Sequence, residues 1–129
     1  MELQIQDIAN VRLIHVEGRI DHTTVQSFQD LLLPKLTDCT GETKKALLDL
    51  NGVHYMTSSG WRVLVLAVRQ CQRQQGEMVL AALSPFLQKI FPMTHFDTVF
   101  KVFATVHAAL EHLSPTAASL YSGQSEDAP

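Results

Sequence analysis

The sequence predicts a single α/β domain with a mixed, mostly parallel β-sheet and about four helices. After an opening pair of strands, short apolar segments alternate with amphipathic ones in the order β-α-β-α-β-α-β-α. Strand–helix–strand connections this short favour parallel strands with helices packed on the sheet. The chain has 129 residues, of which 46% are hydrophobic and 18% charged, so it can bury one core. We expect the domain to span residues 1–113 and a disordered polar tail to follow over residues 114–129.

The chain opens with a predicted β-hairpin or pair of adjacent strands. Leu3 and Ile5 alternate with polar neighbours, as in a strand with one buried face. Residues 7–10 have the composition of a turn, and the apolar residues of 11–17 predict the second strand.

An amphipathic helix follows. Asp21 or Thr23 can serve as its N-cap, and Thr23 with Gln26 has the form of a capping box. Pro34 falls inside the apolar pattern, so the helix is expected to end or kink near Leu33. The apolar face of this helix is predicted to carry Val25, Phe28, Leu32 and Leu36.

Two predicted strands flank the most regular helix of the chain. The apolar run over residues 46–50 is typical of a strand buried on both faces, and residues 78–83 predict another. Between them, the apolar spacing predicts a helix over residues 58–75, with Gly76 as its C-terminal stop. The core side of this helix is predicted to carry Trp61, Leu64, Val68 and Cys71.

The same alternation continues to the end of the domain. Ser84 followed by Pro85 is an N-cap with proline at the first helical position, which predicts a short helix closed by Pro92. Residues 98–103 predict a strand and residues 105–113 a final helix.

Charge, hydropathy and residue spacing exclude several functions. The net charge is −3 and no stretch concentrates the basic residues, so nucleic acid is not an expected partner. The longest apolar run, residues 63–68, is too short to cross a bilayer, and the acidic, polar N-terminus is not a signal peptide. We therefore expect a cytoplasmic protein without a membrane partner. The histidines lack metal-ligand spacing and no glycine-rich phosphate motif occurs, so no metal and no cofactor are expected.

Residues 51–60 form the candidate site. The hydroxyl residues Thr57, Ser58 and Ser59 lie where a buried strand gives way to a helix. A helix N-terminus has free N–H groups and partial positive charge, which suit an anion such as phosphate. Asp21 also follows a strand, and sites in parallel sheets gather outside the carboxyl ends of the strands. We therefore expect Asp21 to approach this turn, where the two serines either cap the helix or also carry a phosphate.

Several segments together resemble one family, the anti-sigma-factor antagonists, which are small STAS-domain proteins of bacterial partner-switching systems. The resemblance rests on Gly-Arg-Ile-Asp-His-Thr-Thr at 18–24, Leu-Leu-Asp-Leu at 47–50, Tyr-Met-Thr-Ser-Ser-Gly at 55–60, Gly-Glu-Met-Val-Leu at 76–80 and Ser-Pro at 84–85. It covers residues 3–113 in order and implies the STAS-type fold, a mixed sheet covered by helices.

The resemblance also implies a function that is not enzymatic. In the family, the unphosphorylated protein binds a serine kinase that doubles as an anti-sigma factor. This kinase uses ATP to phosphorylate the serine at the start of the second helix, which ends binding, and a PP2C-type phosphatase restores the active form. By position, the phosphorylated serine is Ser58, two residues before Gly60.

Thr57 departs from the family pattern, which commonly has Asp at this position. Threonine can still cap a helix. The lost carboxylate can change kinase preference or the rate of dephosphorylation, and it leaves Thr57 and Ser59 as competing acceptors. We expect Gly60 to keep side-chain bulk away from the approach to Ser58, and Asp21 both to cap its helix and to take part in kinase recognition.

The second helix offers a predicted binding face. Arg62, Arg69 and Arg73 form a polar stripe. Val65 and Leu66 lie within it and have two readings. They are either half-buried against a neighbouring helix or the exposed apolar centre of the partner interface.

Two rival functions remain beside the phospho-switched binding protein. One is a STAS scaffold in a transport or stress complex that is never phosphorylated. The other is a small α/β enzyme with Ser58 as nucleophile, which is disfavoured because the G-x-S-x-G pattern would need glycine where Met56 stands.

Overall fold

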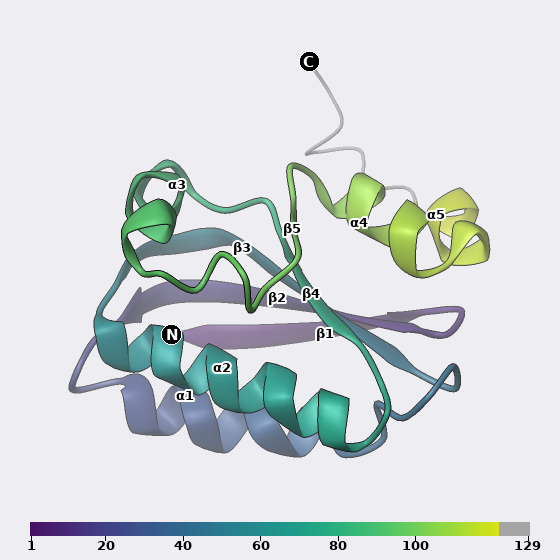
Figure 1. Ribbon diagram of the computed structural model, residues 1–129, viewed down its shortest axis with the longest axis horizontal. Helices are drawn as coiled ribbons and strands as arrows, with labels where there is room; N and C mark the ends of the chain where they lie inside the picture. Colours follow the sequence, from purple (N-terminus) through teal and green to yellow (C-terminus); the bar gives the residue numbers. More distant parts are fainter. Residues whose placement is uncertain (122–129) are drawn as a thin grey trace.

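A computed structural model describes residues 1–121 and contains one five-stranded sheet in the order β1-β2-β3-β4-β5 (Figure 1). β1 is antiparallel to β2, and each later strand is parallel to its neighbour. The predicted mixed, mostly parallel sheet is therefore confirmed. The strands are β1 (Glu2–Ile8), β2 (Val11–Ile20), β3 (Lys45–Met56), β4 (Met78–Ala81) and β5 (Val102–Phe103).

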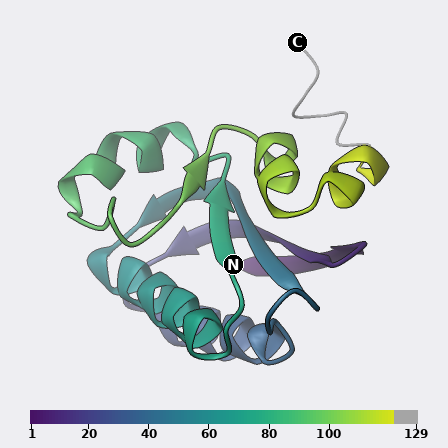
Figure 2. The same ribbon diagram turned by 45° about the vertical axis from the view of Figure 1, so that its right-hand side comes forward.

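Helices cover both faces of the sheet. α1 and α2 lie together on one face, α4 and α5 lie on the other, and α3 lies at the end of the molecule where α2 begins (Figures 1 and 2). The α-helices are α1 (Val25–Leu32), α2 (Ser58–Arg73), α3 (Pro85–Ile90), α4 (Val106–Leu113) and α5 (Pro115–Leu120). Two 3-10 helices, η1 (Leu33–Leu36) and η2 (Phe91–Met93), extend α1 and α3. The end of α1 at Leu32 agrees with the effect expected of Pro34.

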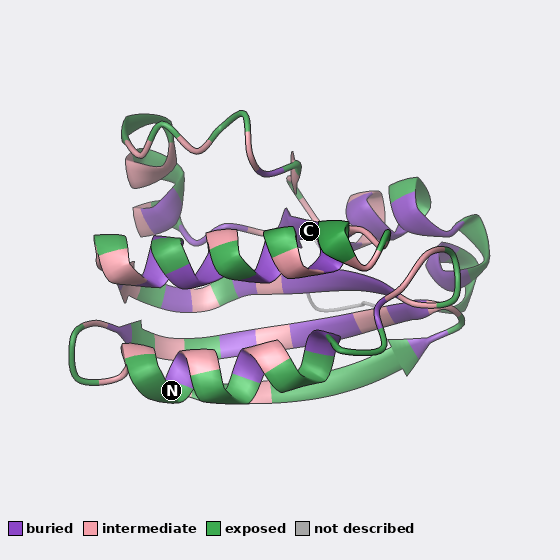
Figure 3. Ribbon diagram, turned by 60° about the horizontal axis from the view of Figure 1, so that its bottom comes forward, coloured by how far each residue is buried: buried purple, intermediate pink, exposed green. Residues whose placement is uncertain are grey.

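The core consists of two apolar layers, one on each face of the sheet. Alternate residues of β2 and β3 point to opposite faces, so Ile14 and Leu48 pack toward α1 and α2 while Leu13 and Leu47 pack toward α4. Figure 3 shows the buried side of α1 and α2 turned to the sheet and β1 exposed along most of its length. The core stripe predicted for α2, namely Trp61, Leu64, Val68 and Cys71, is buried throughout.

β3 is longer than predicted. It continues past residue 50 to Met56, because its pairing with β2 tolerates two irregularities. At the first of them, the Asp49 carboxylate accepts a hydrogen bond from the Asn51 N–H (2.9 Å), and Gly52 lies so close to Glu17 that a Cβ would be 2.6 Å from its Cγ. Only Thr57 therefore separates strand from helix at the candidate site.

The C-terminal part differs from the expectation in two places. β5 has only two residues, far fewer than the strand predicted over residues 98–103. The expected tail begins with a helix, α5, because Ser114 accepts a hydrogen bond from the Ala117 N–H (3.2 Å) and Pro115 follows it. α5 therefore lies in the first part of the expected tail and adds a helix to the four that the spacing of apolar residues predicts. The rest of the expected tail, residues 122–129, lies outside the described residues.

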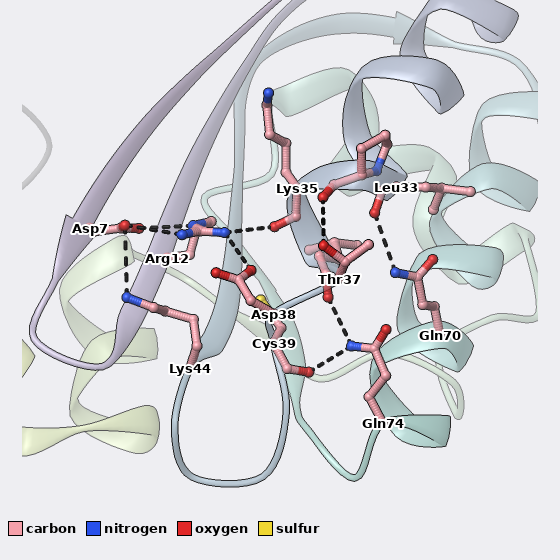
Figure 4. Close-up of polar contacts among 12 residues, drawn as sticks. Asp7, Arg12, Leu33, Lys35, Thr37, Asp38, Cys39, Lys44, Gln70 and Gln74 are labelled. Atoms are coloured by element: carbon pink, nitrogen blue, oxygen red, sulfur yellow. Dashed lines mark hydrogen bonds and ion pairs between the residues drawn. The ribbon is translucent and has the colours of Figure 1, made fainter.

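Polar contacts fasten the connection after η1 to both the sheet and α2 (Figure 4). Arg12 of β2 makes a two-pronged pair with Asp7 (2.9 and 3.1 Å) and reaches Asp38 (2.6 Å). The Gln74 side-chain amide donates to the Cys39 carbonyl (2.9 Å) from the end of α2. α1, β2 and α2 are thus tied together at the end of the molecule remote from Ser58.

The C-terminal end of α2 has a different turn residue from the one predicted. Gln75, with a φ of 62°, adopts the left-handed conformation, and Gly76 follows it. The Gly76 N–H donates to the Cys71 carbonyl (2.7 Å), and a Cβ on Gly76 would lie 2.4 Å from the Cys39 carbonyl oxygen. Gly76 is therefore required by close backbone packing.

Candidate functional site

The carboxyl ends of the neighbouring strands β2 and β3 lie side by side. They form what we call an edge of the sheet, meaning here the side at which its parallel strands end. Ile20 is paired with Met56, and the Thr57 N–H donates a hydrogen bond to the Ile20 carbonyl (3.0 Å). Asp21 and Thr57 each come directly after one of these paired residues. The structure therefore brings Asp21 and the start of α2 to the same edge, as the alternation of strands and helices predicts.

Three hydroxyl residues begin α2, and their side chains are in different environments. Thr57 is the N-cap residue by position, and its carbonyl accepts from the Gly60 N–H (3.0 Å). Its side chain does not cap the helix, because the Thr57 hydroxyl lies 2.8 Å from the Ser59 hydroxyl and both side chains are half-buried. Ser58 is exposed, and its hydroxyl makes no hydrogen bond within residues 1–121. Thr57 therefore holds the N-cap position, but its hydroxyl bonds to Ser59 and not to a backbone N–H of α2.

Gly60 has a packing role that sequence reasoning assigned differently. It is buried, and a Cβ at this position would lie 2.4 Å from Met56 Cγ and 2.9 Å from Ile20 Cγ2. Real Cβ atoms do not approach other carbon atoms this closely. Gly60 therefore faces the strands and lets α2 begin close to them, and the idea that it clears an approach to Ser58 was wrong.

Asp21 organises the turn before α1 and does not cap the helix. Its carboxylate accepts from the Thr23 N–H (2.9 Å), the Thr23 hydroxyl (2.6 Å) and Arg19 Nε (2.8 Å). The bonds from Thr23, followed by the one from Arg19, hold the pKa of Asp21 well below its usual range. The N-cap residue of α1 is Thr24, and Gln26 bonds within its own helix, so no capping box forms. Asp21 is a fixed carboxylate at the edge.

Aromatic contacts extend this edge to α3. The Arg19 guanidinium lies 4.1 Å from the centre of the Tyr55 ring, and that ring contacts Phe86 of α3 with centroids 5.3 Å apart. Ser84 caps α3 as predicted and donates from its hydroxyl to the Val53 carbonyl of β3 (2.5 Å). α3 is thereby held beside the end of β3.

An apolar groove opens beside Ser58, between the first turn of α2 and the segment around η2; we call it the α2–η2 groove. Its volume is about 410 Å³, and Met93 on its wall is 71% exposed. Sequence reasoning missed it because its two walls are far apart along the chain. The lining residues are Met56, Ser58, Trp61, Arg62, Ile90, Met93, Thr94 and Phe96.

The outer face of α2 carries the predicted arginine stripe. Arg62, Arg69 and Arg73 are exposed, and none of them forms an ion pair within the part of the chain that the structure describes. Leu66 is 44% exposed between them, whereas Val65 is half-buried against the core. Each of the two interpretations therefore holds for one residue: Leu66 is exposed on the surface, and Val65 is half-buried.

Two further sequence expectations concern what the fold contains. Over residues 1–121, no group of three or more His, Cys, Asp or Glu side chains is arranged to hold a metal ion. In the same part of the chain, no helix combines the length and apolar character needed to span a membrane.

Known proteins resemble this chain in both sequence and fold. The STAS domain family matches residues 2–109. BtrV of Bordetella bronchiseptica, a protein named as an anti-sigma factor antagonist, is 28% identical over 109 residues, which cover 84% of this chain and 91% of BtrV. A solved anti-sigma-factor antagonist (STAS) domain protein from Planctomyces limnophilus has a TM-score of 0.76 at 25% identity, covering 87% of this chain and 97% of its own.

SpoIIAA, a further anti-sigma factor antagonist, shares the fold at lower identity. Its unphosphorylated form gives a TM-score of 0.68 at 18% identity, covering 88% of this chain and 97% of SpoIIAA. The phosphorylated form from Bacillus gives 0.59 at 18% identity, covering 87% and 99%. The family match spans most of the chain and the STAS-type fold agrees with it. This chain therefore belongs to the STAS domain family, among relatives that are anti-sigma factor antagonists.

Proposed function

We propose that this protein is a phospho-switched binding protein of a partner-switching system in the cytoplasm. Its unphosphorylated form binds an anti-sigma-factor serine kinase, and this binding releases the target that the kinase holds. Phosphorylation on Ser58 ends the binding, and a PP2C-type phosphatase restores it. The family membership supports a regulatory binding role, and SpoIIAA, which shares the fold, exists in unphosphorylated and phosphorylated forms.

The observation that carries the choice of Ser58 is the contrast between the three hydroxyls at the start of α2. Ser58 is exposed and free of hydrogen bonds to other residues in 1–121, whereas the Thr57 and Ser59 hydroxyls are half-buried and lie 2.8 Å apart. A kinase must close over its acceptor and align it with ATP, which an exposed hydroxyl allows. Thr57 and Ser59 would first have to give up their mutual bond.

The modification is a phosphoryl transfer from ATP. The Ser58 oxygen forms a bond to the γ-phosphorus as the bond to the β,γ-bridging oxygen breaks, ADP leaves, and the hydroxyl proton passes to a base of the kinase. The product carries about −1.5 to −2 charges at the N-terminus of α2, where the helix dipole tolerates negative charge. We therefore expect the fold to survive and the surface to change.

Thr57 leaves the start of α2 intact without the carboxylate common in the family. The Thr57 carbonyl and N–H make the contacts to Gly60 and Ile20 that anchor the helix. Asp21 supplies a carboxylate at the same sheet edge, held in place by Thr23 and Arg19. We propose that Asp21 contributes to kinase recognition there.

The partner surface is proposed to extend from Ser58 along α2. The α2–η2 groove lies on one side of Ser58, and the exposed Leu66 lies two turns farther along the helix between arginines. Exposed apolar side chains ringed by arginine are typical of the centre of a protein–protein interface.

Incubation with ATP and each candidate anti-sigma-factor serine kinase of the same organism, followed by intact-mass measurement and peptide mapping, tests the proposal. One added phosphoryl group on Ser58, absent from Ser58→Ala and retained in Ser59→Ala, is the expected result. An unmodified Ser58 under a kinase that is active on a control substrate would leave the unphosphorylated scaffold as the better description. Modification of Ser59 or Thr57 would move the switch to a neighbouring residue.

A further inference from the structure

Ser58 and Arg62 lie one helical turn apart on the rim of the α2–η2 groove. Residues four apart on a helix have Cβ atoms about 5–6 Å from each other, and both side chains line the same hollow. Within residues 1–121, Arg62 has no carboxylate partner and the Ser58 hydroxyl has no hydrogen bond. A cation and a candidate phosphate acceptor are thus placed side by side, with neither engaged elsewhere.

The groove between them has a definite chemical character. Its wall is formed by methionine, tryptophan, isoleucine and phenylalanine side chains, while Arg62 is the charged residue at its rim. An apolar hollow beside an unpaired guanidinium is complementary to an aliphatic side chain next to a carboxylate. Any protein that encloses Ser58 also covers this groove.

We propose that Arg62 reads the phosphorylation state of Ser58. With Ser58 unmodified, Arg62 pairs with a carboxylate of the partner kinase, and an aliphatic side chain beside that carboxylate enters the α2–η2 groove. With Ser58 phosphorylated, the phosphoryl oxygens form an ion pair with the Arg62 guanidinium in the same helix. The carboxylate of the kinase then no longer pairs with Arg62, and it is repelled by the phosphate dianion on Ser58 at the mouth of the groove. This inference rests on the proposed function, and it names the partner chemistry and the residue through which the switch acts.

The position of Arg62 distinguishes it from the other arginines of the stripe. At 1.5 Å per residue, Arg62 is about 6 Å from Ser58 along the helix axis, whereas Arg69 is about 16 Å and Arg73 about 22 Å away. Arg62 lines the groove, and Arg69 and Arg73 do not. An anion N-terminal to a cation at this four-residue spacing is also the favourable order on a helix. Arg69→Gln is therefore a matched control for Arg62→Gln.

The intramolecular half of the proposal can be tested without a kinase. The protein is prepared with phosphoserine incorporated at position 58, and the second ionisation of the phosphate is titrated by ³¹P NMR. Arg62 favours the dianion, so Arg62→Gln is expected to raise that pKa by about 0.3, a roughly twofold change in the dissociation constant. Arg69→Gln is expected to leave it unchanged. Identical titrations for the wild type and Arg62→Gln would overturn the pairing.

The intermolecular half uses the kinase identified in the mapping experiment. Arg62→Gln is expected to weaken binding of the unphosphorylated protein about tenfold. Lys35→Gln removes an exposed cation on η1, outside the proposed partner surface, and is expected to weaken binding less than twofold. Met93→Ala, which opens the groove wall without changing charge, is expected to weaken it severalfold. If Arg62→Gln binds like the wild type, Arg62 does not meet the partner and the inference fails. If even the wild type neither binds nor is phosphorylated, the proposed function fails, while the NMR titration still decides the Ser58–Arg62 pair.

Discussion

Replacing Gly60 with alanine is expected to destabilise the domain by about 1–2 kcal/mol. The new Cβ would lie 2.4 Å from Met56 Cγ, 2.7 Å from Met56 Sδ and 2.9 Å from Ile20 Cγ2. Moving these buried side chains costs about 1–3 kcal/mol. Alanine recovers up to about 1 kcal/mol relative to glycine in a helix interior. Gly60 is only the third residue of α2, so we expect a smaller gain and a net loss of about 1–2 kcal/mol. At about 2.1 cal/mol/K per residue of unfolding entropy, that loss lowers Tm by about 4–8 °C.

Urea denaturation followed by tryptophan fluorescence measures this loss. Trp61 is the only tryptophan, is buried and lies next to the substituted residue. Met56→Ala supplies the control, because it removes two of the three close contacts. In that background Gly60→Ala should cost at least about 1 kcal/mol less, which a double-mutant cycle reports as coupling. A Gly60→Ala protein as stable as the wild type would show that the start of α2 does not depend on this close approach.

Two further predictions concern the turn at Asp21 and the cap of α5. Bonds from Thr23 and Arg19 lower the folded-state pKa of Asp21, so its stabilising effect is present above the unfolded-state value of about 4 and is lost as pH falls through the lower folded value. The difference in urea midpoint between the wild type and Asp21→Asn should therefore shrink from pH 6 to pH 2; a difference independent of pH would refute the assignment. Ser114→Ala removes the acceptor for the Ala117 N–H and should cost about 1 kcal/mol, with faster amide exchange confined to α5. Unchanged exchange there would show that the Ser114 hydroxyl does not hold the helix.

The main sheet and the helices before residue 91 follow from signals that act locally. The continuous apolar runs of β3 and β4 are typical of strands buried on both faces. Ser84 followed by Pro85 starts α3, as an N-cap followed by proline predicts. The same Ser-Pro signal starts α5 at Ser114 and was overlooked because the residues after it are small and polar. Its two buried residues are alanines, which contribute little to any hydrophobic pattern.

The parts that could not be predicted depend on contacts between distant segments. β3 continues through polar residues because it pairs with β2 and because the Asp49 carboxylate stabilises the irregular pairing through its bond to the Asn51 N–H. The pattern of apolar residues in the sequence carries no information about either contact. The role of Gly60 depends on the side chain of Ile20, some forty residues earlier, lying beneath it. The groove next to Ser58 exists because the segment around η2 packs beside α2. This packing joins segments that are far apart in the sequence, so local sequence patterns do not predict it.

The affinity of the kinase for two matched forms of the protein, unmodified and phosphorylated on Ser58, tests the switch most directly. Isothermal titration should give a Kd at least a hundredfold weaker for the phosphorylated form, a difference of about 2.7 kcal/mol. Far-UV circular dichroism and Tm should match, because the added charge lies at the N-terminus of α2. Equal dissociation constants for the two forms would contradict the account, since Ser58 would then carry a phosphate without controlling the partner.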